Sequence, residues 1–203
     1  NRLDILAYIT KLRQLCLDPS TVIDNYKGNS TKIDILIDIL SEKIEEGHKL
    51  LVFSQFTSVL KNISQRLDIE NIRYSYLDGS LSAKARECAV TKLKEGESDV
   101  FLISTKAGGT GLNLTEADIV IHFDPWWNPA VEDQATDRAH RIGQKNAVEV
   151  IRLIAKDTVE EKIIELQDRK RDMINNILNN SACETSNSLD FKDVLNILKS
   201  RQF

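Results

Sequence analysis

The 203-residue sequence lacks features that mark several large classes of protein. Its three cysteines, Cys16, Cys88 and Cys183, lie far apart and form no CxxC pair, so we expect neither a disulfide framework nor a zinc site. We therefore expect the protein to work in a reducing compartment. No apolar run approaches the roughly 18 residues of a membrane span. The net charge of -4 argues against a domain that binds nucleic acid through bulk positive charge. The composition is otherwise that of a globular protein.

Two nucleotide-binding signatures are also missing. The sequence holds no GxxxxGK[ST] string, whose backbone amides and lysine wrap phosphates, and no DExH-type acidic box. Without them the chain has no obvious means to hold Mg²⁺ and position a hydrolytic water, so we do not expect it to hydrolyse a nucleotide by itself. A dinucleotide fingerprint fails as well, because the third glycine position after Gly109 and Gly111 is Leu114. The first residues follow a charged helical pattern without an initiator methionine, which predicts a piece of a longer protein.

What the sequence does contain is a regular alternation of apolar patterns. Helical spacing predicts a first helix over residues 1–16, and Ser30 is placed to cap a second helix that stops near Gly47. Short apolar runs predict strands at 49–54, 72–77, 100–104, 119–123 and 148–154, with helices at 58–67, 82–94 and 131–140 between them. This order predicts an α/β fold, a mainly parallel sheet with helices on both faces and functional loops at the strands' carboxyl ends.

The last part of the chain changes character. After Asp157 the pattern is helical and strongly charged, which predicts a helix that docks on the domain by one apolar stripe. Residues 179–188 read as a polar linker, and residues 191–198 as a last short helix. We therefore predict three parts: a first helix and linker at 1–29, the α/β lobe at 30–156 and a helical extension at 157–203.

Two arginines in the segment DQATDRAHRIGQ, Arg138 and Arg141, are three residues apart on the helix predicted to start near residue 131. Two guanidiniums on one helical face can grip a polyphosphate. The alternative is a structural role in salt bridges, which many exposed helices show. Such arginines can also act on a phosphoryl group held by a different domain, where they stabilise the developing charge.

A glycine-rich loop and a tryptophan pair lie upstream of these arginines. The loop KAGGTGLNL at residues 106–114 follows a strand and can approach a phosphate closely, or it is a plain tight turn. Ser104 and Thr105, at the end of that strand, offer hydroxyls and amides of the kind that position a nucleic-acid backbone. Trp126 and Trp127 are bracketed by prolines, which favours one exposed indole that meets a sugar or base over two buried core residues. The three histidines, His48, His122 and His140, show no metal-ligand spacing.

Six blocks in a fixed order resemble the second RecA-like lobe, or helicase C-terminal domain, of a SWI/SNF-family superfamily-two ATPase. The blocks are LRQLCLDP (12–19), KLLVFSQF (49–56), YLDGSLSAKAR (76–86), STKAGGTGLNL (104–114), FDPWWNP (123–129) and DQATDRAHRIGQ (133–144). HRIGQ is the most specific of these tags. The wording from FDPWWNP onward and the short spacing between blocks resemble the prokaryotic branch of the family.

The resemblance implies roles for individual residues. Arg138 and Arg141 would be catalytic arginine fingers that reach across an interlobe cleft to ATP, and Gly109, Gly111 and Gln134 would border the same nucleotide. Contacts along a DNA backbone and minor groove would come from Ser54, Gln55, Gly79, Ser80, Ser104, Thr105, Lys106 and Trp127. At Lys106 the family often has arginine, so the charge is kept but the bidentate fork is lost. No residue is expected to bind a metal.

The resemblance also implies an activity and partners for the longer protein. It would be a DNA-dependent ATPase that translocates on double-stranded DNA or remodels protein-DNA complexes, using ATP with Mg²⁺ held mainly by a first RecA-like lobe. Further implied partners are DNA-bound proteins or RNA polymerase, and no membrane is expected among the partners. The implied location is the cytoplasm, with the nucleoid, in a prokaryote, or the nucleus in a eukaryote. The alternatives are a lobe of a strand-separating helicase, or a stand-alone interaction module that uses the charged 157–178 helix or the 191–198 helix.

Overall fold

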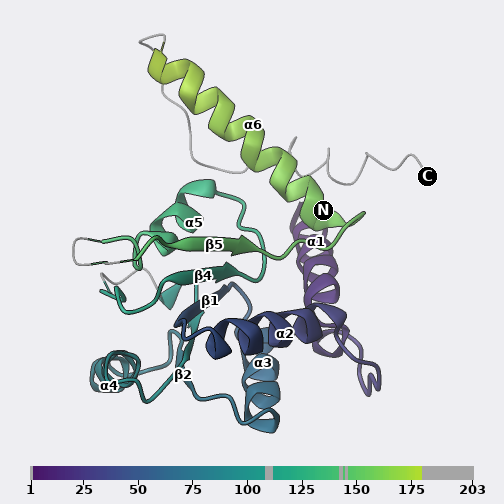
Figure 1. Cartoon of the computed structure of the whole chain (residues 1–203). Coiled ribbons are helices and arrows are strands. Elements are labelled where there is room, and N and C mark those ends of the chain that lie inside the picture. Colours follow the sequence, from purple (N-terminus) through teal and green to yellow (C-terminus); the bar gives the residue numbers. More distant parts are fainter. Residues whose placement is uncertain (1, 108–111, 142–143, 145, 180–203) are drawn as a thin grey trace.

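The computed structural model describes residues 2–107, 112–141, 144 and 146–179 of the chain (Figure 1). Helices and strands alternate along most of it. In chain order they are α1 (Arg2–Leu17), the 3-10 helix η1 (Pro19–Thr21), α2 (Thr31–Glu45), β1 (Leu50–Ser54), α3 (Thr57–Ile69), β2 (Tyr74–Leu77), α4 (Ala83–Lys94), β3 (Val100–Ser104), β4 (Ile119–His122), α5 (Pro129–Thr136), β5 (Glu149–Arg152) and α6 (Val159–Asn179).

The five strands form one sheet in the order β2-β3-β1-β4-β5. Every neighbouring pair is parallel, with Leu50 of β1 opposite Val100 of β3 and Ile119 of β4. The three central strands are buried along their whole length, as expected of apolar runs in a sheet covered on both faces. The predicted α/β fold with a parallel sheet is confirmed.

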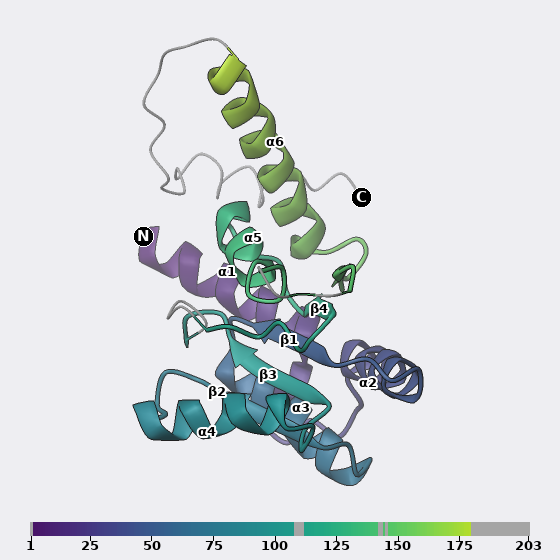
Figure 2. The ribbon, with the colours of Figure 1, turned by 60° about the vertical axis from the view of Figure 1, so that its left-hand side comes forward.

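Helices cover both faces of this sheet (Figures 1 and 2). Successive side chains of a strand point to opposite faces, so Leu50 and Val52 pack with apolar residues of α2 and α3, whereas Leu51 and Phe53 pack with α4 and α5. Two cores therefore lie on the two sides of one layer. This three-layer arrangement places the carboxyl ends of all five strands at a single edge, because the strands are parallel.

Local signals in the sequence explain where α2 begins and ends. The Ser30 hydroxyl accepts a hydrogen bond from the Ile33 amide at 3.3 Å, which satisfies one of the free amides of the first turn. Gly47 follows the last turn with a φ of +87°, a conformation that side chains disfavour. Both predicted positions are confirmed.

The arginine-bearing helix is shorter than the sequence predicts. Helix α5 ends at Thr136, and Asp137 is its C-cap, so Arg138 and Arg141 lie in the turns that follow. In these turns the Arg138 amide donates to the Ala135 carbonyl and the Arg141 amide to the Ala139 carbonyl, instead of continuing the helical pattern. The expectation that both guanidiniums share one helical face is therefore wrong.

Helix α6 docks by a narrow stripe at its start and then projects away from the sheet (Figure 1). Glu160, Ile163 and Gln167 are buried, at the spacing of one helical face, and α6 contacts α1. This confirms a C-terminal helical extension. The predicted linker lies outside the described residues except for Asn179, the end of α6, and so does the predicted 191–198 helix. Among the described residues, no helix is both long and apolar enough to cross a membrane.

Candidate functional site

The central strand β1 ends at a junction where several predicted site residues meet. The Ser54 carbonyl accepts a hydrogen bond from the Thr105 amide at 2.9 Å, and Ser54 pairs with Ser104 across the ladder. Thr105 is half-buried and Lys106 exposed, but Ser54 and Ser104 are buried, so their side chains lie behind the surface. The contact with DNA that the resemblance implies for these two residues stays a prediction.

The turn after β2 presents backbone at the same edge. The Asp78 carboxylate accepts hydrogen bonds from the Ser80 amide at 2.8 Å, the Ser80 hydroxyl at 2.5 Å and the Tyr76 hydroxyl at 3.1 Å. The hydrogen bond from the Ser80 hydroxyl holds the pKa of Asp78 below its usual value. Burial of the carboxylate raises this pKa, but by less. Gly79 is exposed, with open space where a side chain would be. The turn is thus fixed by a charged carboxylate and offers Gly79 and Ser80 to the solvent.

The turns after α5 bring the arginines next to the end of the glycine-rich loop. The Leu114 amide donates to the Arg138 carbonyl at 3.1 Å, which ties residues far apart in the sequence. Arg138 is buried with 3% of its surface exposed, whereas Arg141 is exposed, as is Gln134 on α5. The predicted nucleotide neighbours Gly109 and Gly111 lie outside the described residues.

The Gln144 side chain holds these turns in place, a role that the sequence did not predict. Its amide nitrogen donates to the Ala117 carbonyl at 2.8 Å and its oxygen accepts from the Asn146 amide at 3.0 Å. Its own backbone amide donates to the Arg141 carbonyl. The last residue of the HRIGQ tag therefore has a structural function, for which the tag itself was the available signal.

The buried guanidinium of Arg138 has two nitrogens without a hydrogen-bond partner among the described residues. These are the Nε and Nη1 atoms. Burial lowers the pKa of Arg138, and the charge of Arg141 lowers it further, against the weaker opposing effect of Asp137. Burying a charge without a partner is costly, so this arrangement favours an anion beside the two arginines.

The tryptophan segment after β4 is fastened by side chains from α5 and α6. Glu132 on α5 accepts hydrogen bonds from the Trp126 amide at 2.8 Å and from Gln167 Nε2 at 2.7 Å, and pairs with Arg152 at 3.1 Å. Gln167 on α6 also donates to the Trp126 carbonyl. In the sequence, Glu132 is an ordinary acidic residue near a helix start, and no pattern indicated that Gln167 reaches it.

Neither tryptophan is fully exposed or fully buried. The indole of Trp127 has the Arg13 guanidinium over its ring, 5.2 Å from the ring centroid. A residue of α1 therefore lies over one face of Trp127, and the predicted contact of an exposed indole with a sugar or base stays a prediction. Only the remaining exposed part is open to a ligand.

His122, the last residue of β4, is a buried neutral imidazole beneath this segment. Its ring stacks on Phe53 with centroids 5.8 Å apart, and its Nε2 lies 3.1 Å from the Thr136 hydroxyl. Burial lowers the pKa of His122 from 6.5 to about 4, with the charges of Glu132 and Arg152 acting in opposite directions.

The buried imidazole predicts a loss of stability in mild acid. Between pH 6.5 and about pH 4 the unfolded chain binds a proton at His122 that the folded chain does not, so the free energy of unfolding falls as the pH falls through this window, by about 3 kcal/mol. Urea unfolding at several pH values measures it. His122→Gln removes this part of the pH dependence, and exposed His140→Gln is the matched control. An unchanged slope in His122→Gln contradicts the prediction.

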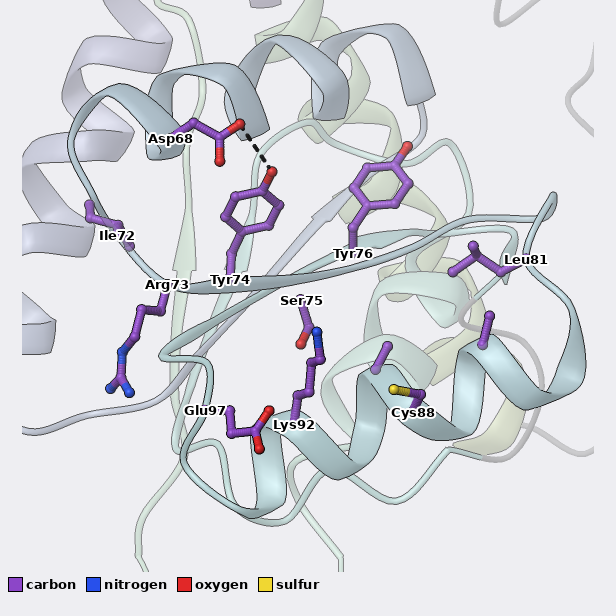
Figure 3. A pocket seen from close by; sticks show the side chains of 12 residues that line it. Asp68, Ile72, Arg73, Tyr74, Ser75, Tyr76, Leu81, Cys88, Lys92 and Glu97 are labelled. Atoms are coloured by element: carbon purple, nitrogen blue, oxygen red, sulfur yellow. Dashed lines mark hydrogen bonds between the residues drawn. The ribbon is translucent and has the colours of Figure 1, made fainter.

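A hollow of about 610 Å³ lies elsewhere, around the edge strand β2 (Figure 3). Tyr74 and Tyr76 point to one side of the strand, where the Tyr74 hydroxyl donates to Asp68, while Cys88 and Lys92 of α4 line the other side. None of the residues predicted to contact nucleotide or DNA lines this hollow. Within the described part of the chain, no group of three or more His, Cys, Asp or Glu side chains is placed to hold a metal ion.

A parallel five-stranded sheet covered by helices on both faces is the architecture of a RecA-like lobe. The chain matches the family described as helicase conserved C-terminal domain over residues 31–143, and it belongs to that family. Within it, the chain is the C-terminal RecA-like lobe of a SWI/SNF-family ATPase, as the ordered blocks predicted.

Individual relatives support this placement. The chain is 44% identical over 179 residues to a protein named as an uncharacterized ATP-dependent helicase of Mycoplasma pneumoniae, covering 86% of this chain and 17% of the relative. It is 40% identical over 200 residues to the human lymphoid-specific helicase, covering 92% and 24%. The Sulfolobus solfataricus SWI2/SNF2 ATPase core, solved in complex with double-stranded DNA, superposes with a TM-score of 0.74 at 33% identity, covering 98% of this chain and 40% of that one.

The chain spans about a fifth of the length of the curated relatives it matches. Those relatives come from bacteria and from eukaryotes at similar identity, so the assignment to a prokaryotic branch stays a prediction. The roles of the individual site residues and the boundaries at residues 29 and 156 also stay predictions.

Proposed function

We propose that this chain is the second motor lobe of an ATP-dependent translocase on double-stranded DNA, which moves along DNA or remodels protein-DNA complexes. The observation that carries the proposal is the buried guanidinium of Arg138, whose Nε and Nη1 have no partner among the described residues, with Arg141 beside it. We also propose that the protein is found in the cell compartment that holds the DNA.

The arginines fit a phosphate that another lobe holds. ATP with Mg²⁺, when bound, supplies a γ-phosphoryl group on which negative charge develops during transfer. Arg138 supplies a desolvated guanidinium, whose interaction with an anion is stronger than in water, and exposed Arg141 supplies a second charge. Gln134, exposed on α5, together with Gly109 and Gly111, would border the same nucleotide.

Grip on DNA comes from the other turns of the edge in this proposal. Gly79, Ser80 and Lys106 are exposed, and Gln55, Thr105 and Trp127 are partly exposed, which suits contact with a sugar-phosphate backbone. Such contacts grip without reading sequence. The similar Sulfolobus ATPase core was solved as a complex with double-stranded DNA, which supports this partner.

The two surfaces together allow coupling of chemistry to movement. A change in the distance between the lobes alters the position of Arg138 and of the DNA-facing turns at once, because the Leu114 amide joins the arginine turn to the loop that follows β3. Hydrolysis then shifts the grip on DNA.

The test uses three proteins: this lobe alone, a P-loop lobe alone, and the protein that joins them. We expect ATP hydrolysis stimulated by duplex DNA in the joined protein, and no hydrolysis by either lobe alone. A displacement assay on a partial duplex accompanies it, and ATP hydrolysis without strand release is the expected result. Strand release would favour a strand-separating helicase instead, and hydrolysis by this lobe alone would contradict the division of the site.

A further inference from the structure

One arginine that the proposed function leaves unused lies at the centre of the site edge. Arg13 belongs to α1 and has 4% of its surface exposed. Its Nη1 donates to Gln55 Oε1 at 3.1 Å, and its Nη2 donates to the Asp124 carboxylate at 3.2 Å and to the Pro125 carbonyl at 2.7 Å. One guanidinium thus joins three segments of the chain that are far apart in sequence.

The two loop segments are also joined to each other around this arginine. Gln55 Nε2 donates to the Asp124 carboxylate at 2.7 Å and to the Pro125 carbonyl at 2.9 Å, and the Gln55 amide donates to Asp124 at 3.1 Å. Asp124 therefore accepts from a charged group, a side-chain amide and a backbone amide. Removal of the arginine would leave this buried carboxylate without its cation.

Aromatic rings complete the surroundings of the guanidinium. Phe56 and Trp127 each lie with their ring centroid 5.2 Å from the Arg13 guanidinium carbon, in the geometry of a cation-π contact. Arg13 Nε has no hydrogen-bond partner among the described residues, so the ring contacts, together with the charge of Glu160, add to what stabilises the guanidinium. Only the planar fork of an arginine makes the three hydrogen bonds and stacks on Trp127 together.

We propose that Arg13 is a positioning residue for the DNA contact, which fixes Gln55 and the indole of Trp127 in the orientation that grips the duplex. The inference rests on the proposed function, because it assumes that these two residues face DNA. It also gives α1 a role, since displacement of α1 moves the residue that holds both loops. Arg13 donates its hydrogen bonds to Gln55, Asp124 and Pro125. None of these residues is among those predicted to border the nucleotide, so the inference concerns DNA binding and not ATP binding.

The test measures ATP hydrolysis by the joined two-lobe protein as duplex DNA is titrated. Arg13→Lys keeps the charge but loses the fork and the stacking. We expect the DNA concentration for half-maximal stimulation to rise by about tenfold, while the KM for ATP and the basal rate without DNA change by less than about twofold. Phe56→Leu, which removes the ring beside the guanidinium and no charge, shifts the DNA constant in the same direction.

A double-mutant cycle separates positioning from a general loss of structure. Trp127→Ala alone raises the same DNA constant, and Arg13→Lys added to Trp127→Ala has less effect than in the parent, because the indole it would position is gone. Arg73→Lys is the matched control, because Arg73 is an exposed arginine that pairs with Asp99 at 2.8 Å and directly precedes β2, the edge strand at the opposite end of the sheet from β5. It leaves all the constants unchanged.

The outcomes distinguish this inference from the proposed function. The inference is overturned if the DNA concentration for half-maximal stimulation is unchanged in both Arg13→Lys and Phe56→Leu. It is also overturned if the fold-changes of Arg13→Lys and Trp127→Ala simply multiply in the double variant, because the two residues would then act independently. If Arg13→Lys does not fold, Phe56→Leu decides. If Trp127→Ala and Gln55→Ala themselves leave the DNA constant unchanged, the DNA surface of the proposed function is wrong, whatever Arg13 does.

Discussion

Arg138→Ala, in a protein that joins this lobe to a P-loop lobe, is expected to lower the turnover of ATP on duplex DNA by about 10³-fold or more. The same loss is expected for Arg141→Ala. The reason is that both side chains would act on charge that develops at the γ-phosphate during transfer, and Arg138 would do so from a buried position where water screens it little.

The loss falls mainly on kcat, because an interaction made in the transition state is removed while the nucleotide is held by the other lobe. Steady-state ATPase assays at saturating duplex DNA measure kcat and the KM for ATP separately. Arg73→Ala, an exposed arginine on the edge strand side, is the matched control and keeps full activity. Full activity in either Arg138→Ala or Arg141→Ala would contradict the proposed role of that residue as an arginine finger.

The second large effect concerns stability and the docking of α6. Glu160, with no exposed surface, accepts two hydrogen bonds from Lys32 Nζ at 2.8 and 2.6 Å and one from the Ala155 amide at 2.7 Å. Burial lowers the pKa of Lys32, and the Glu160 carboxylate opposes that shift. Glu160→Ala would leave a buried ammonium without its partner, so we expect a loss of about 3–5 kcal/mol in the free energy of unfolding.

Urea unfolding of the 203-residue chain measures this loss. The double variant Lys32→Met with Glu160→Leu is the informative comparison, because removing both charges replaces a buried pair by apolar contacts, which is often neutral. We expect it to recover most of the stability lost in Glu160→Ala. The exposed pair of Lys162 with Glu165 at 2.8 Å is the control, and Glu165→Ala there should cost less than about 1 kcal/mol. Equal losses at the two sites would show that burial does not set the effect.

The sequence predicted most of the elements because their signals are local. The N-cap at Ser30, the stop at Gly47 and the apolar run of β1 depend on residues within one or two turns of each other. The end of α5 was harder, because the segment after Thr136 keeps helical composition while its turns are held by contacts with Leu114 and the Gln144 side chain. Those contacts arise only when the loops are packed together.

The candidate site divides in the same way. The ordered blocks identified the family, and the missing P-loop led to the prediction that the arginines act on a nucleotide held elsewhere. They did not indicate which arginine is buried, or that Ser54 and Ser104 lie behind the surface. Exposure of a side chain depends on what the rest of the chain packs against it, which no local pattern records.

By itself, then, the sequence determined the fold class, the family and the residue types available for chemistry, since periodicity, caps and short motifs are fixed by near neighbours along the chain. Only the tertiary structure decided which of those residues meet. Arg13 reaches Asp124 across 111 positions of sequence, and Gln167 reaches Glu132 across 35. Such contacts form because α1 and α6 both pack beside the loop that follows β4. The free energy that stabilises them comes from burial and from hydrogen-bond partners that the linear order of residues does not reveal.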